Sequence, residues 1–99
     1  MPAPRPKAQP TVFIDNARTA VTEWRFAPGA ETGWHKHGHD YVVVPMTTGQ
    51  LLLEEPGGTA RTVDLTAGRP YTRDEGVEHN VVNPNLSEFV FIEIEMKQA

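Results

Sequence analysis

Turn-forming residues cut this chain into short segments along most of its length. From Thr11 onward, glycine, proline and asparagine recur at intervals of about ten residues, a spacing that suits strands and leaves little room for helices. The intervening segments are rich in β-branched, aromatic and aliphatic residues, as strands usually are. The sequence therefore predicts eight strands, over residues 11–14, 21–26, 41–46, 50–53, 61–65, 70–72, 79–82 and 89–96.

Several of these segments alternate between apolar and polar residues, so one face of each strand is expected in a core and the other in water. Trp24 and Phe26 share one face of their segment, for example. No segment has a helical period and caps over a useful length. We expect one all-β domain over residues 11–99, an antiparallel β-barrel or jelly roll with little or no helix.

The composition excludes several classes of function. With no cysteine in the chain, disulfides, thiolate zinc sites, iron–sulfur clusters and a cysteine nucleophile are ruled out. The formal net charge of −4 argues against a nucleic-acid partner, and no apolar run reaches the roughly 20 residues needed to cross a membrane. Residues 1–10 hold four prolines and no secretory signal, so we expect a flexible tail there and a cytoplasmic protein.

The four histidines occupy two short stretches, with His35, His37 and His39 within five positions and His79 alone. Side chains two residues apart on a strand point the same way, so His35 and His37 can reach one metal ion. An antiparallel barrel can place His79 beside them, and three protein ligands leave positions open for water, substrate or oxygen. The alternative is an exposed polar loop, because the segment around the first pair is hydrophilic.

The spacing around these histidines resembles the first motif of the cupins. In that family a glycine and five residues precede His-x-His, and a glutamate and a second glycine follow. Here Gly29 stands five residues before His35, and Gly49 closes the motif one residue late.

The second cupin motif is matched from Gly68 to Asn83. Gly76 and His79 stand at the family's intervals, and Asp74 replaces the usual proline. Together the two motifs cover residues 29–83. The resemblance implies a small single-domain cupin with the RmlC-like jelly roll, in which His79 joins the first pair as a metal ligand.

The chain departs from the cupin pattern at the metal-ligating glutamate. Tyr41 and Val42 stand at the two spacings where that residue is expected. Tyr41 shares the inward parity of the histidines, so its hydroxyl is a candidate catalytic group beside a metal-bound water or substrate. His39 shares that parity and is a less favoured fourth ligand, with exposure at the rim as the alternative. Asp40 would ligate only if Gly38 broke the alternation.

A three-histidine site without a carboxylate resembles those of cupin oxygenases that bind Fe(II). The resemblance implies one divalent metal ion, with Fe(II) favoured and Zn, Ni or Mn as alternatives. Neutral ligands leave the ion electropositive, which favours a small carboxylate as substrate. Because ligating imidazole must be neutral and its free pKa is about 6.5, we expect metal affinity to fall below that pH.

Two functions follow from this site. The first is a metal-dependent enzyme, either dioxygenase-like or a lyase or isomerase, in which Arg25, Arg69 or Arg73 could pair with the substrate carboxylate. The second is a non-catalytic cupin that binds a small ligand or metal as a sensor or storage module, which the missing glutamate keeps open. The segments 23–29 and 40–45 resemble very small cupins linked to β-alanine degradation, which implies small amino-acid or aldehyde-acid metabolism.

The last predicted strand carries four aliphatic residues on one face and Phe89, Phe91, Glu93 and Glu95 on the other. The aliphatic face is the stronger candidate for the interior, so we expect the glutamates to point outward. Two phenylalanines on an outer face would then be covered by a second subunit, which predicts a homodimer.

Overall fold

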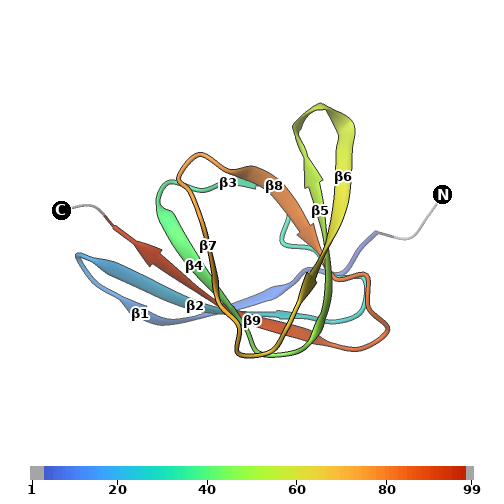
Figure 1. Ribbon diagram of the computed structural model, residues 1–99, viewed down its shortest axis with the longest axis horizontal. Coiled ribbons are helices and arrows are strands. Elements are labelled where there is room, and N and C mark those ends of the chain that lie inside the picture. Colours follow the sequence, from blue (N-terminus) through green and yellow to red (C-terminus); the bar gives the residue numbers. More distant parts are fainter. Residues whose placement is uncertain (1–3, 98–99) are drawn as a thin grey trace.

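The computed structural model describes residues 4–97 of the chain. Within them the structure has nine strands and one short 3-10 turn at Pro56–Gly58 (Figure 1). No helix of the described residues is long and apolar enough to cross a membrane. The strands are β1 (Gln9–Asp15), β2 (Thr19–Phe26), β3 (His35–Lys36), β4 (Asp40–Pro45), β5 (Gly49–Glu55), β6 (Thr59–Leu65), β7 (Tyr71–Arg73), β8 (Glu78–Val82) and β9 (Phe89–Met96).

The strands form two sheets with antiparallel pairing throughout. The five-stranded sheet has the order β1-β2-β9-β4-β7, and the four-stranded sheet has the order β3-β8-β5-β6. Figure 1 shows the two sheets curving around a common interior, with β3 and β8 across from β9. Strand β7 is one edge of the five-stranded sheet and β6 is one edge of the four-stranded sheet. The predicted all-β antiparallel jelly roll is confirmed.

Each of the eight predicted strands corresponds to an observed strand, with boundaries that differ by a few residues. The additional strand, β3, has only two residues, too few for a periodicity to be recognised. The predicted inward face of β2 is also confirmed, because Phe26 is fully buried and Trp24 packs against the core.

The prediction for β9 is wrong. Phe89, Phe91 and Glu93 are 1%, 4% and 9% exposed, so this face of the strand points into the interior. The ring of Phe91 packs against that of Phe26, with centroids 5.4 Å apart. Large aromatic rings fill the interior better than the smaller aliphatic side chains, and they decide which way the strand faces.

The aliphatic residues of β9 lie on the outer side of the five-stranded sheet. In the sequence they resemble a core-facing set. In the fold they lie beside other aliphatic residues on β2 and β4. Ile94 pairs with Val21 and Val42, and Ile92 pairs with Val44. These five half-buried residues form what we call the outer aliphatic face.

Residues 4–10, part of the predicted tail, contact the folded domain. Ala8 is 7% exposed, and its backbone nitrogen donates a hydrogen bond to the Glu31 carbonyl at 2.8 Å. The Arg5 guanidinium pairs with Glu54 at 2.8 Å and with Glu31 at 3.2 Å. An extended proline-rich segment is already in a conformation that can pair with strands. Residues 1–3 of the predicted tail lie outside the described residues.

The side chain of Asn83 stabilises the connection between β8 and β9. Its side chain is fully buried, and its amide nitrogen donates to the carbonyls of Phe26, Ala27 and Ser87 at 3.1, 3.3 and 2.9 Å. Its amide oxygen accepts a hydrogen bond from the Asn85 backbone at 2.8 Å. One side chain therefore satisfies backbone groups of two separate loops.

Replacing Asn83 with alanine should lower the free energy of unfolding by about 3 kcal/mol, since it leaves several buried carbonyls without donors. Asn85→Ala is the matched control at the same corner. Its side chain is half-buried and donates to the Gln50 carbonyl and to the Asn83 amide oxygen, both at 2.7 Å. Because that oxygen keeps its bond from the Asn85 backbone, we expect a loss of about 1 kcal/mol. Urea denaturation of both variants measures the difference, and equal losses would contradict the role given to Asn83.

Candidate metal centre

A short strand pairing brings the first histidine of the cluster to the last. β3 pairs with β8 in a register that sets His35 directly opposite His79. His37 follows β3, and its backbone is held by two hydrogen bonds to the loop before β8: its nitrogen donates to the Val77 carbonyl at 2.9 Å, and its carbonyl accepts from Gly76 at 2.8 Å. Three imidazoles from two chain segments therefore meet on one side of the β3–β8 pair.

The three rings converge through their Nε2 atoms. His37 Nε2 lies 3.0 Å from His35 Nε2 and 3.1 Å from His79 Nε2. The Nδ1 atom of His35 lies 2.8 Å from the Gly33 carbonyl, which can only accept, so Nδ1 carries the ring proton and Nε2 presents a lone pair. This hydrogen bond also fixes the orientation of the ring, as partners of metal-binding histidines commonly do.

Three neutral rings cannot all form hydrogen bonds to one another in this arrangement. His35 has no proton on Nε2, so the two Nε2 contacts of His37 share at most one well-directed hydrogen bond. A cation among the three nitrogens would be bound by all of them at once.

The nitrogen spacing also fits a metal ion. Two ligand atoms about 2.1 Å from one ion lie about 3.0 Å apart at a right angle, or about 3.4 Å apart at the tetrahedral angle. The three histidines form a group that can hold a metal ion.

Two of the three imidazoles are buried, which keeps them neutral. Burial, with a smaller contribution from nearby positive charge, lowers the pKa of His37 to about 4 and that of His79 to about 3. Both rings are therefore in the form that ligates metals throughout the neutral range and well into the acidic range. For these two candidate ligands, the loss of metal affinity expected below about pH 6.5 moves to lower pH.

Tyr41 lies against the histidine cluster. Its ring stacks on that of His37 with centroids 3.9 Å apart and planes at 19°. Its hydroxyl is buried and has no hydrogen-bond partner among the described residues, and burial raises the pKa of this hydroxyl. The neutral hydroxyl is thus free to bond to a group that enters the site.

The other two candidate ligands lie apart from the cluster. Neither His39 nor Asp40 belongs to the group of nitrogen and carboxylate atoms that can hold an ion within the described part of the chain. Asp40 is exposed, and its carboxylate accepts a hydrogen bond from the Glu75 backbone at 2.7 Å. It therefore braces the loop after β7.

Glu93 is the site residue that the sequence interpretation missed. Its carboxylate is close enough to His37 and Glu95 for the three to form a second group that could hold an ion. Burial, with a smaller contribution from Glu95, raises the pKa of Glu93 to about 7. The phenylalanines on the same face of β9 were the available signal, because they fix the direction of the strand.

These residues surround a small enclosed space that we call the histidine cavity. Its volume is about 40 Å³, room for roughly one or two water molecules. The buried indole nitrogen of Trp24 faces no hydrogen-bond partner among the described residues. The lining residues are Trp24, Thr32, His35, His37, Tyr41, Val43, Leu51, Leu53, Tyr71, Arg73, His79, Val81, Phe91 and Glu93.

Of the three arginines predicted to pair with a substrate, only Arg73 lines the histidine cavity. Arg25 lies at the surface and is paired with Glu23 at 3.0 Å and Glu88 at 2.9 Å. Arg69 borders a neighbouring groove and does not line the cavity.

Comparison with known proteins shows that this chain is similar to cupins. No family model matches the sequence. The chain is 63% identical over 93 residues to the β-alanine degradation protein BauB of Pseudomonas aeruginosa, a match that covers 94% of this chain and 97% of the relative.

Solved structures agree with that similarity. A crystal structure of a cupin domain from Bordetella pertussis superposes with a TM-score of 0.94 and 66% identity, covering 98% of this chain and all of that one. An RmlC-like cupin with a double-stranded β-helix fold from Methanocaldococcus jannaschii has a TM-score of 0.76 at 10% identity, covering 92% of this chain and 81% of that one. The second likeness shows the fold alone.

Replacing Glu93 with glutamine should change how stability depends on pH in the metal-free protein. The ordinary pKa of Glu93 is 4.5 and the folded chain raises it to about 7, so between these values the folded state holds a proton that the unfolded state has released. As the pH rises, ionisation of Glu93 therefore lowers the free energy of unfolding of the wild type. The variant has no ionisable group at this position and is not affected in this way. From pH 4.5 to pH 8, unfolding free energies should shift in favour of Glu93→Gln by about 3 kcal/mol.

His37 and His79 act in the opposite direction, because the unfolded chain takes up protons on these rings below about pH 6.5. Their contribution is common to both proteins and cancels in the difference. Urea titrations at several pH values measure it. A difference that stays constant over this range would show that Glu93 ionises equally readily in both states.

Proposed function

This chain belongs to the cupins, in the family of the β-alanine degradation protein BauB, and we propose that it is a metal-dependent enzyme acting on a small carboxylate. In this proposal His35, His37 and His79 hold one divalent metal ion. Tyr41 is the polar group beside the ion, and the remaining coordination positions receive the substrate.

The observation that carries the proposal is the convergence of three imidazole Nε2 atoms at 3.0 and 3.1 Å around His37. A structural zinc site would use four protein ligands, whereas an ion with three protein ligands keeps positions for chemistry. The cavity beside the rings, about 40 Å³ in volume, supports the same conclusion, because a purely structural site has no need of one.

When bound, a divalent ion held by three neutral imidazoles supplies an electropositive centre that polarises a substrate oxygen and acidifies bound water. By the resemblance to three-histidine cupin oxygenases we favour Fe(II), with Zn, Ni or Mn as alternatives.

The protein's own groups complete the site. The Tyr41 hydroxyl is buried without a partner among the described residues, so it can donate a hydrogen bond to a substrate oxygen. Glu93 lines the same cavity and supplies a carboxyl group that can hold or accept a proton. Aromatic and aliphatic walls, including Phe91 and Leu51, exclude water and strengthen these interactions.

The substrate class follows from charge and size. A site with neutral metal ligands favours an anion, and the cavity admits only a small group. The name of the BauB relative links that protein to β-alanine degradation. We extend that link to this chain as a role in the breakdown of a small amino acid or aldehyde-acid.

We also propose that the protein is a homodimer joined through the outer aliphatic face. This face carries five aliphatic side chains on three adjacent strands, and Ile14 and Met96 beside it are 47% and 41% exposed. A domain this small gains stability by burying such a surface. The face lies on the opposite side of β9 from Glu93, so a partner would cover it without closing the histidine cavity.

Untagged protein should contain close to one metal ion per chain and should turn over a small carboxylate. His79→Ala should lose both the metal and the activity, since a ligand is gone. Tyr41→Phe should keep the metal and lose about tenfold or more of the turnover. His39→Ala is the matched control and should keep both.

Elemental analysis gives the metal content, and oxygen uptake and product formation are measured on the Fe(II), Ni(II) and Zn(II) forms with a panel of small carboxylates. Metal that survives His79→Ala would overturn the ligand set. Full metal content with no turnover of any panel member would favour the non-catalytic sensor or storage module.

The homodimer is tested by placing a charge on the outer aliphatic face. Ile94→Lys should shift the sedimentation coefficient from dimer to monomer, because its neighbours across the strands are Val21 and Val42 and a buried lysine would lack a partner there. Thr62→Lys on the exposed part of β6 is the control and should remain dimeric. A wild-type monomer at micromolar concentration would rule out this interface.

A further inference from the structure

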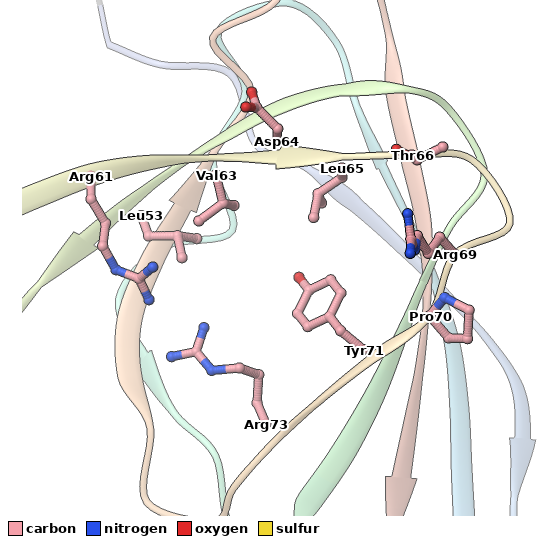
Figure 2. A pocket seen from close by; sticks show the side chains of 10 residues that line it. All are labelled: Leu53, Arg61, Val63, Asp64, Leu65, Thr66, Arg69, Pro70, Tyr71 and Arg73. Carbon is pink, nitrogen blue, oxygen red and sulfur yellow. The ribbon is translucent and has the colours of Figure 1, made fainter.

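A second, larger depression opens beside the histidine cavity. It lies between β6 and β7, one edge strand from each sheet, and we call it the seam groove (Figure 2). Its volume is about 590 Å³. Leu53, Val63 and Leu65 form its apolar side, and Tyr71 and Arg73 of β7 border the other.

Two guanidinium groups point into the seam groove from its opposite strands. Arg61 extends from β6 and Arg73 from β7, and Figure 2 shows their guanidinium ends directed toward one another. The Tyr71 hydroxyl points into the same space from β7. Arg61 shares the inner side of β6 with Val63 and Leu65, since alternate residues of a strand face the same way.

These two positive charges have little compensation within the protein. Arg61 uses its Nε atom on Glu55 at 3.0 Å, which leaves its terminal nitrogens available. Within residues 4–97, no carboxylate forms an ion pair with Arg73. Asp64 points away from the two guanidinium groups in Figure 2, and Gln50 donates a hydrogen bond to it at 2.8 Å.

Two facing cations repel one another, and a bound anion would remove the repulsion. Guanidinium groups bind carboxylates through paired, charge-assisted hydrogen bonds. The Tyr71 hydroxyl adds a neutral donor at the same place.

The seam groove and the histidine cavity share three lining residues, Leu53, Tyr71 and Arg73. Arg73 is near enough to the cluster for its charge to act on His37 and His79. The histidine cavity, about 40 Å³ in volume, has room for only one or two non-hydrogen atoms of a ligand. A substrate whose reactive end enters it must therefore leave its remaining atoms in the seam groove.

We propose that the seam groove is the substrate-binding subsite, in which Arg61 and Arg73 hold the carboxylate of a short carboxylic acid whose opposite, polar end enters the histidine cavity. This assignment rests on the proposed function for the role of the inner end, while the carboxylate site itself needs no metal. It selects a short acid with a polar group at the far end and discriminates against neutral analogues.

The test compares an anion with its neutral isostere. Calorimetric titration of the purified protein with 3-hydroxypropionate should give saturable binding, and 3-hydroxypropionamide should bind at least about tenfold more weakly, since it lacks the charge that two arginines recognise. Metal content is recorded on the same samples.

Variants assign the binding to the two arginines. Arg73→Gln should raise the dissociation constant for 3-hydroxypropionate about tenfold or more, and Arg61→Gln by a smaller factor because Glu55 already occupies part of its guanidinium. Arg18→Gln, in the exposed turn between β1 and β2 and outside both the seam groove and the histidine cavity, is the control and should stay within about twofold of wild type. Arg73→Gln should not lose thermal stability, because it breaks no ion pair among the described residues and removes a repulsion.

The outcomes separate this subsite from the metal proposal. Carboxylate binding that depends on the arginines in a protein without metal would support the subsite and count against the metal enzyme. Unchanged carboxylate affinity in Arg61→Gln and Arg73→Gln would overturn the subsite, whatever the metal content. If the same variants also aggregate, the charges serve to keep the two edge strands from pairing with other chains.

Discussion

The pairing of β3 with β8 determines where the chemistry of this protein can occur. Only two residues of β3 take part, yet they set His35 opposite His79, and the loop hydrogen bonds at Gly76 and Val77 then hold His37 beside them. A shift of one residue in this register would turn an imidazole to the other face of the strand. The Nε2 separations of 3.0 and 3.1 Å therefore depend on backbone geometry more than on side-chain freedom.

The five-stranded sheet has an unusual distribution of polar and apolar side chains. Its inner face mixes aromatic rings with Tyr41, Glu93 and Arg73, and its outer face is aliphatic. Buried polar groups without partners are costly, and three of them, at Trp24, Tyr41 and His79, lie in or beside one small cavity. That cost is reasonable where a ligand completes the hydrogen bonds. The outer face is explained in the same way if a second subunit covers it.

Much of this architecture is readable from the sequence, and the exceptions have physical causes. Turn spacing predicts the strands because glycine and proline act locally, and the spacing of His35 and His37 predicts a shared face because strands have a period of two. The sequence does not predict which face of β9 is buried, because both faces carry apolar residues. Only the packing of Phe91 on Phe26 decides between them. Glu93 and Arg61 are missed for a related reason: their roles depend on which strands meet across the interior, and a single sequence does not specify that pairing.

The proposed function depends on three imidazoles binding one ion, and anomalous diffraction from crystals of the metal-loaded protein tests this most directly. Data collected at the absorption edge of the bound metal should show one peak about 2.1 Å from the Nε2 atoms of His35, His37 and His79. A peak beside His39, or one held by His37 with Glu93 and Glu95, would contradict this set of ligands. So would a metal-loaded crystal with no peak among the three rings.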